Sequence, residues 1–193
     1  MDKIPISVDK PAVGVRIAQV VGLTSSAYLA GAIGGISLFS CPALLQAPAP
    51  LLAKQWQTVF DKGKFLAPPL SVVSAAIFGG LAYRAPKESP SILLYTAAAL
   101  LVPSIIPYTV FAMGTVNKKL SDKASSLTDA AAESGIAQEE TAHALVDKWA
   151  TLNLIRSFLP LVATVCAAWA SVDNYEILGL ASLSLRSGAN RMG

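Results

Sequence analysis

One helical face in the C-terminal half of the chain carries an indole, an amide and a guanidinium. Trp149, Asn153 and Arg156 are spaced i, i+4 and i+7, which places them on one side of an α-helix. Arg156 is the only charge between positions 150 and 172, a stretch long enough to span a bilayer. A cation there costs about 3 kcal/mol unless it reaches the interface or finds partners. Two interpretations remain open: Arg156 extends to a nearby interface, or it faces a polar cavity inside a helix bundle.

The elements that position these groups are long apolar runs. Of the 193 residues, 53% are hydrophobic and 14% are charged, whereas soluble domains carry about 25% charged residues. The sequence therefore predicts one integral membrane domain over residues 1–193. The predicted fold is all-α, a four-helix transmembrane bundle with both termini on the same side and a helical extension before the fourth span. The spans are predicted at about 17–45, 65–83, 91–114 and 150–172, with a soluble loop at 118–148.

Local signals refine these spans. Small residues recur every four positions at Ala27, Gly31 and Gly35, which predicts the close approach of a neighbouring helix. Lys54–Lys64 is basic and aromatic, and we expect it to connect the first two spans. Pro103 and Pro107 lie inside the third run, where proline frees backbone carbonyls and kinks the helix.

Further polar groups border the predicted spans on the side where Arg156 lies. Asn117 ends the third run, and Trp56, Asp61 and Lys64 lie between the first and the second. Antiparallel connectivity puts all of them at one face of the bilayer, so the sequence predicts that they converge. The simpler alternatives are an aromatic belt for Trp56 and a helix cap for Asn117.

His143 is the only histidine in the chain. It lies thirteen residues before Arg156 on the predicted helical extension, about 120° around the helix from the Trp149 face. Histidine is the side chain that most readily accepts a proton near neutral pH, so His143 is the candidate base. The alternative is a solvated surface histidine, since only a bent or shortened helix brings it to that face.

The residue types exclude several functions. Carboxylates occur only outside the predicted spans, which excludes a paired-carboxylate site or an acidic proton relay within the membrane. A single histidine, with Cys41 and Cys166 far apart, predicts no metal site. The net charge of +3 contains no basic block, so nucleic acid is not expected as a partner. No dinucleotide fingerprint, P-loop, zinc-protease motif or nucleophile signature is present.

Three sequence blocks carry a resemblance to a known family. They are Gln55-Trp56 to Gly63 with Pro68-Pro69, then Pro107-Tyr108-Thr109 with Asn117-Lys118-Lys119-Leu120, and then Trp149 with Asn153, Arg156 and Pro160. In order and spacing these blocks resemble the anthrone oxygenases, small four-span proteins of fungal polyketide pathways that are also called noranthrone monooxygenases. The resemblance covers nearly the whole chain. One departure is Thr115-Val116, where the family pattern has Pro-Thr.

The resemblance implies a cofactor-independent monooxygenase that oxidises a polyketide anthrone to the anthraquinone, with O2 as co-substrate. A guanidinium would stabilise the substrate enolate, amides would orient it, indoles would stack on its rings, and a histidine would accept its proton. The implied catalytic residues are Arg156, Asn153 and His143, and the implied substrate-binding residues are Trp149, Trp56, Asn117, Thr109 and Lys64.

The resemblance also implies a multi-pass protein of the endomembrane system, with the endoplasmic reticulum expected, and the anthrone and the lipid bilayer as partners. Two other functions remain open at this point. One is a non-catalytic membrane protein in which Arg156 and Asn153 tie helices together; the other is a small transporter or lipid-binding module. Lysines and arginines divide seven and seven between the two sides, so charge does not predict the orientation.

Overall fold

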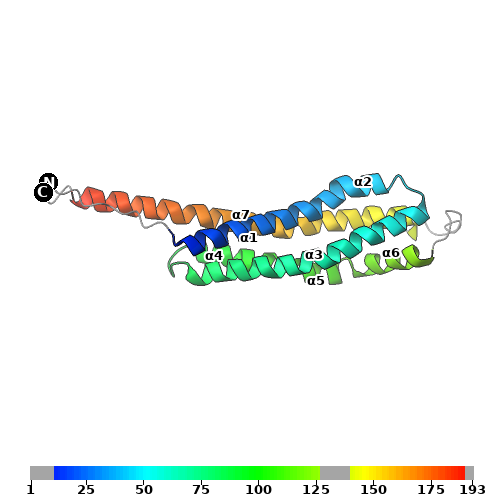
Figure 1. The fold of residues 1–193 in the computed structure, drawn as a ribbon, viewed down its shortest axis with the longest axis horizontal. Coiled ribbons are helices and arrows are strands. Elements are labelled where there is room, and N and C mark those ends of the chain that lie inside the picture. The colour runs from blue at the N-terminus through cyan, green and yellow to red at the C-terminus, as the bar shows by residue number, and fades with distance from the viewer. Residues whose placement is uncertain (1–10, 127–139, 190–193) are drawn as a thin grey trace.

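The fold is an elongated helical bundle, described here from a computed structural model. The structure describes residues 11–126 and 140–189, with side chains up to residue 173. Within these ranges the regular elements are all helical (Figure 1). They are α1 (Val13–Gly35), η1 (Ile36–Ser40), α2 (Cys41–Leu44), α3 (Ala49–Arg84), α4 (Ser91–Leu101), α5 (Ile105–Phe111), α6 (Gly114–Ser126) and α7 (Ala142–Ala189).

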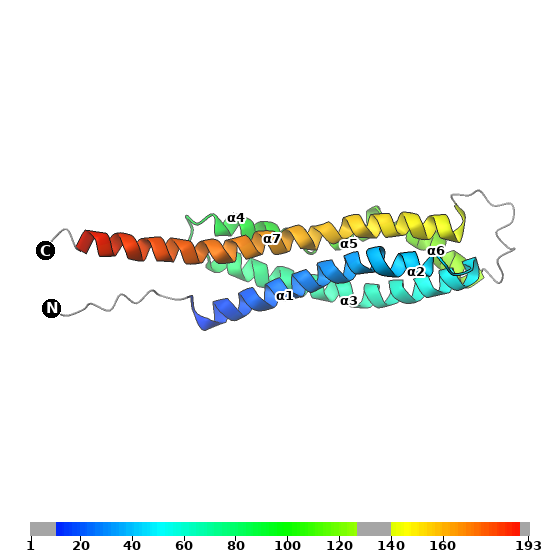
Figure 2. The ribbon, with the colours of Figure 1, turned by 90° about the horizontal axis from the view of Figure 1, so that it is seen from above.

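Four helical stretches in the described ranges are long and apolar enough to cross a membrane, which confirms the predicted four-span, all-α architecture. They cover Val13–Leu44, Ala49–Arg84, Ser91–Phe111 and Ala142–Asp173. α7 runs along the bundle and packs against α1 and α4 (Figure 2). α1 begins and α7 ends at the same end of the bundle, so successive spans run antiparallel.

The second span is longer than the sequence pattern predicted. α3 begins at Ala49 and includes Lys54–Lys64, so the expected connector is part of the helix. Charges mark the end of an apolar run, but they do not end a helix, because the backbone hydrogen bonds continue through them. Pro68 and Pro69 lie inside α3, which continues through them. Pro103 lies in the break between α4 and α5, so the third span is interrupted at the proline where a kink was predicted.

The first span changes its winding just before a proline. η1 is a π-helical turn over Ile36–Ser40, and Pro42 follows it in α2. Proline lacks an amide hydrogen and its ring clashes with the carbonyl four residues earlier, so the helix widens before it. Polar groups of α1 and η1 in this region form hydrogen bonds with α7.

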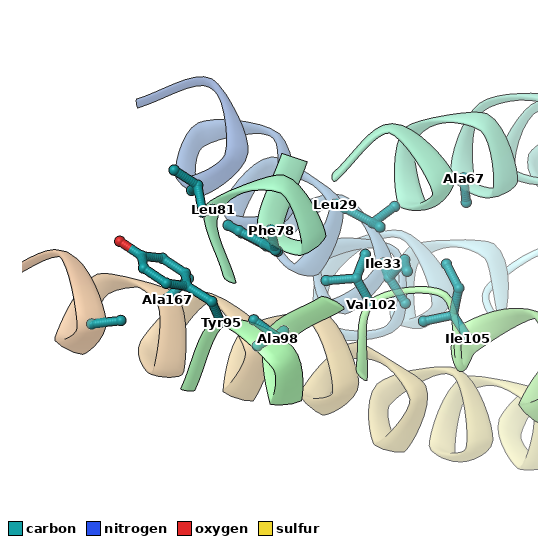
Figure 3. Packing of buried hydrophobic residues seen from close by; sticks show 12 residues of the cluster. Leu29, Ile33, Ala67, Phe78, Leu81, Tyr95, Ala98, Val102, Ile105 and Ala167 are labelled. Atoms are coloured by element: carbon teal, nitrogen blue, oxygen red, sulfur yellow. The ribbon is translucent and has the colours of Figure 1, made fainter. Parts of the chain in front are cut away.

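The main core lies between α1, α3, α4 and α7. Figure 3 shows Leu29, Phe78 and Val102 among its side chains, and all three are buried. Ala67 of α3 lies farther along the same cluster, near Ile105 of α5. A second cluster surrounds the two buried indoles at the end of the bundle where α3 and α7 begin.

Helices α1 and α3 pack tightly at Gly22. A Cβ atom there would lie 2.8 Å from Cε1 of Phe78, whereas a Cβ at Gly31 would meet nothing within 4 Å. The prediction of a close approach at Gly31 was therefore wrong. A four-residue spacing identifies a stripe of small residues, but it does not say which of several such stripes faces a neighbour.

Candidate active site

The guanidinium of Arg156 is held by two neutral side chains. Its Nη1 donates to Oγ1 of Thr109 (2.7 Å) and its Nη2 donates to Oδ1 of Asn153 (2.7 Å). Its Nε is buried and has no hydrogen-bond partner among the described residues. Within the same ranges no carboxylate lies close enough to form an ion pair with it. The positive charge is thus oriented by the protein but not neutralised by it.

Asn153 fixes the orientation of that guanidinium. Its side chain is fully buried, and Nδ2 donates to the backbone oxygen of Ile33 (2.8 Å) and to Oγ of Ser37 (2.8 Å). Since Oδ1 accepts from Arg156, both ends of the amide are occupied. Asn153 is therefore a positioning residue, whose hydrogen bonds connect the π-helical region of the first span to Arg156 on α7.

Three aromatic rings from α3 and α7 form a cluster. Trp149 donates from Nε1 to Oδ1 of Asn117 (2.9 Å), and its ring meets Trp56 edge to face at 5.7 Å between centroids. Trp56 in turn stacks on Phe60 at 5.0 Å with an interplanar angle of 12°. The Nζ of Lys64 lies 5.5 Å from the Phe60 ring centroid, a cation–π contact. Residues from α3, α6 and α7 thus converge, as the sequence predicted.

An apolar cavity opens beside these groups, between α3 and α5, with a volume of about 240 Å³. We call it the α3–α5 cavity. Its polar lining comes from Lys64, Thr109, Trp149 and Arg156. The remaining lining residues are apolar or glycine, namely Val59, Phe60, Gly63, Ala67, Pro68, Ile105, Ile106 and Val110.

A second cavity, of about 300 Å³, lies on the other side of α3, against α1. We call it the α1–α3 cavity. Arg156 lines it too, together with Val59, Gly63 and Ala67 of α3. Its other lining residues are Tyr28, Leu29, Ala32, Ile33, Ile36, Thr58, Lys62 and Leu66. One guanidinium therefore borders two apolar spaces.

His143 is not brought to this site. Its Nε2 forms a hydrogen bond with the backbone oxygen of Ala47 (3.0 Å), and it lines neither cavity. Thirteen residues of α-helix also separate it from Arg156 by about 20 Å along the axis. The bend or late helix start that would bring it across does not occur, because α7 begins at Ala142. Asn117 also lies behind Trp149 and not on a cavity wall.

Sequence reasoning missed the residues of α1 and η1 that hold the site. Ser37 and the carbonyl of Ile33 bind Asn153, and neither stands out in an uncharged run. The one available signal was Pro42, which disturbs helical hydrogen bonding in the residues before it. Tyr108 was also missed as a contact: its hydroxyl donates to the backbone oxygen of Leu152 (3.3 Å) and ties α5 to α7.

The described residues contain no group of three or more histidine, cysteine or acidic side chains that could hold a metal ion. Cys41 and Cys166 are both free thiols. The donors that border the cavities are nitrogen and hydroxyl groups, which suit an organic anion more than a cation.

Comparison with known proteins identifies close relatives. The family model described as "Anthrone oxygenase" matches residues 56–166. The chain is 36% identical over 150 residues to an anthrone oxygenase of Claviceps purpurea, which covers 76% of this chain and 84% of the relative. It is 29% identical over 174 residues to the anthrone oxygenase encC of Aspergillus fumigatus (83% and 95%). A noranthrone monooxygenase of Aspergillus flavus is 27% identical over 150 residues (76% and 70%). No solved structure matches the chain.

Proposed function

Because the chain belongs to the anthrone oxygenase family, we propose that this membrane enzyme oxidises an aromatic polyketide anthrone to the anthraquinone, with O2 as co-substrate. One oxygen atom becomes the new carbonyl of the central ring and the other leaves as water. The central methylene carbon loses four electrons, and O2 accepts all four. The reaction therefore balances without an external reductant.

The observation that carries this proposal is the unneutralised guanidinium of Arg156 beside two apolar cavities. A buried charge without a counter-ion is costly, and a bound anion relieves that cost. Arginine stays protonated and offers a planar fork of donors. An anthrone is neutral when it enters and becomes an enolate in the reaction, so the site binds the reacting anion more tightly than the substrate.

The chemistry begins with loss of a proton from the central methylene carbon. The resulting enolate passes one electron to O2, and the two radicals combine to form a carbon–oxygen bond. The peroxide takes up a proton, and loss of the remaining central hydrogen with hydroxide then breaks the O–O bond and leaves the ketone and water. The steps up to formation of the carbon–oxygen bond involve a delocalised anion or its radical, which a fixed positive charge can steer.

We assign roles to the site residues by their contacts. Arg156 stabilises the enolate oxygen, and Thr109 and Asn153 orient its two nitrogens. Trp149 supplies an aromatic wall to the α3–α5 cavity. The exposed Lys64 lies at the edge of this cavity, where it forms an ion pair with Asp61 (3.6 Å), and it contacts the substrate from there.

Asn117 and Trp56 support Trp149 from behind. Because His143 lines neither cavity, we propose that water takes the methylene proton, with the guanidinium lowering the free energy of the anion.

We further propose that no metal or flavin takes part, since the substrate itself supplies the electrons. The four apolar spans make the protein a multi-pass membrane protein. We propose the endoplasmic reticulum or another endomembrane as its location, because a flat, apolar substrate partitions into lipid and reaches the cavities from there.

The test is oxidation of 1,8-dihydroxyanthrone by the full-length protein in lipid nanodiscs, measured against the rate of autoxidation in empty nanodiscs. With 18O2 we expect one labelled atom in the central carbonyl and the other in water. Arg156→Ala should lower kcat about 10²- to 10³-fold, the usual effect of removing a transition-state donor. No excess rate in the unmodified protein, with this or other anthrones, would instead support a structural role for Arg156.

Arg156→Lys keeps the charge but loses the fork, so it separates electrostatics from geometry. Arg84→Ala is the control, because Arg84 is exposed at the end of α3 and lines neither cavity. Size-exclusion profiles of all variants show whether each one folds.

A further inference from the structure

The two cavities share one strip of α3. Residues four apart on a helix lie in a row along one face, so the cavity-lining residues of α3 form three adjacent rows. The outer rows each line one cavity, and the middle row lines both. The rows are Phe60, Lys64 and Pro68 for the α3–α5 cavity, Val59, Gly63 and Ala67 for both cavities, and Thr58, Lys62 and Leu66 for the α1–α3 cavity.

Gly63 is the middle residue of the shared row. A Cβ atom built on it would meet nothing within 4 Å, so the space in front of this glycine is open. Ala67, one turn further, is also small. Arg156 faces the same region from α7, because it lines both cavities. Its two hydrogen-bond partners point to opposite sides: Thr109 lines the α3–α5 cavity, and Asn153 binds the carbonyl of Ile33, which lines the α1–α3 cavity.

Cavity volume indicates how much of a ligand each side can hold. An apolar cavity of about 150 Å³ accepts a single benzene ring. Scaled by the number of ring carbons, three fused rings need roughly 350 Å³ at the same clearance. The α3–α5 cavity has about 240 Å³ and the α1–α3 cavity about 300 Å³. Each has room for one ring, and neither has room for all three.

We infer that the two cavities form one continuous binding slot that passes beneath α3 at Gly63. This inference rests on the proposed function. The central ring of the anthrone lies between Gly63 and Arg156, which brings the carbonyl oxygen to the guanidinium. One outer ring occupies the α3–α5 cavity and the other occupies the α1–α3 cavity.

The α1–α3 cavity then acts as a specificity subsite for the second outer ring and its substituents. Its outer wall comes from α1 and η1, where Tyr28, Ala32 and Ile36 are the side chains that a substituent on that ring would meet. Lys62 and Arg156 are the two charged residues of its lining, and most of the others are apolar, so it recognises the outer ring mainly by shape.

Two substitutions test the slot. Gly63→Leu places a side chain across the junction, and Ala32→Phe fills the α1–α3 cavity from a position that does not line the other cavity. Gly79→Leu is the matched control for the first, because Gly79 also lies in α3, also has open space at its Cβ and lines neither cavity. Ala27→Phe is the matched control for the second, since Ala27 is exposed on α1 and lines neither cavity.

The measurement is binding of 1,8-dihydroxyanthraquinone, a tricyclic ligand that does not react, by quenching of tryptophan fluorescence in nanodiscs. The KM for 1,8-dihydroxyanthrone is measured in parallel. Gly63→Leu and Ala32→Phe should each raise Kd and KM at least tenfold, while both controls stay within twofold of the unmodified protein. Ala32→Leu replaces Ala32→Phe if the larger side chain prevents folding.

The outcomes separate the two proposals. If the unmodified protein turns over anthrone and Ala32→Phe leaves Kd and KM within twofold, the slot is overturned and the proposed function stands. If the protein binds the ligand in the expected pattern but oxidises no anthrone, the slot stands and the proposed function falls. If it neither binds nor oxidises, both are overturned.

Discussion

Trp149 and Asn117 are joined by a hydrogen bond of 2.9 Å from the indole Nε1 to the amide oxygen Oδ1. This bond links α6 to α7 and sets the tilt of a ring that lines the α3–α5 cavity. Because Asn117 does not line the cavity, it acts on the substrate only through Trp149.

We expect Asn117→Ala to weaken substrate binding through the loss of this one bond. A hydrogen bond contributes about 1 kcal/mol, which corresponds to a roughly fivefold increase in KM. Asn117→Asp retains an acceptor and should restore most of the affinity. The tryptophan emission maximum, compared with that of the unmodified protein, reports a changed ring environment in each variant, since Trp56 and Trp169 are the same in all of them. Equal KM values for Ala and Asp variants, with unchanged fluorescence, would contradict the positioning role.

Substitutions at Thr109 separate the contribution of the free charge of Arg156 to catalysis from the contribution of its position. Thr109→Val removes one hydrogen bond to the guanidinium and should lower kcat/KM about fivefold. Thr109→Asp places a carboxylate beside the guanidinium and neutralises it. The site would then lose its preference for an anion, so we expect a drop of about 10² or more in kcat. Similar losses in both variants would show that only geometry is involved.

His143 provides a test of the proton acceptor. The imidazole binds the backbone oxygen of Ala47 and lies outside both cavities. We therefore expect His143→Ala to leave kcat within about twofold and the pH profile unchanged, since general-base catalysis contributes about 10²-fold or more. A large loss of kcat together with a lost inflection near neutral pH would restore His143 as the base.

Glu140 gives the bundle a sensitivity to acid near the active site. Lys119 of α6 lies 2.6 Å from its carboxylate, and this hydrogen bond lowers the pKa of Glu140 below its ordinary value of 4.5. A lowered pKa means that the stabilisation is present above the ordinary value and is lost as pH falls through the lowered one. We expect the amide protection factors of α6 to fall as the pH is lowered through the range in which Glu140 takes up a proton.

Glu140→Gln should show faster exchange in α6 already at neutral pH and no further step in acid. Because both partners of this ion pair are partly exposed, the effect on global stability should be small. If Glu140→Gln and the unmodified protein show the same pH response, that response comes from the titration of another group.

Metal removal should not affect turnover. Since the substrate supplies the electrons, we expect EDTA treatment to leave kcat for 1,8-dihydroxyanthrone within twofold of the untreated enzyme. The control is elemental analysis of the treated protein, which shows that removal was complete. Loss of activity on chelation, with recovery when one particular metal is added back, would contradict the proposed chemistry.

The sequence by itself determined the spans and the helical faces. Four long apolar runs predict membrane helices, because a helix pairs its backbone groups within one segment of the chain. The helical period alone puts Asn153 and Arg156 on one side of α7. Chain order puts Trp56 and Asn117 near that side, since successive spans run in opposite directions.

Only the tertiary structure decided what these faces meet. Among the described residues Arg156 binds Thr109 and no carboxylate, and this depends on the rotation and depth of α5 and α7, which packing sets and periodicity does not. The support from Ser37 arises from the π-helical turn before Pro42, a local change of winding in a uniformly apolar run. The two cavities flank the open space before Gly63 because neighbouring helices stay apart there, although sequence shows only a glycine.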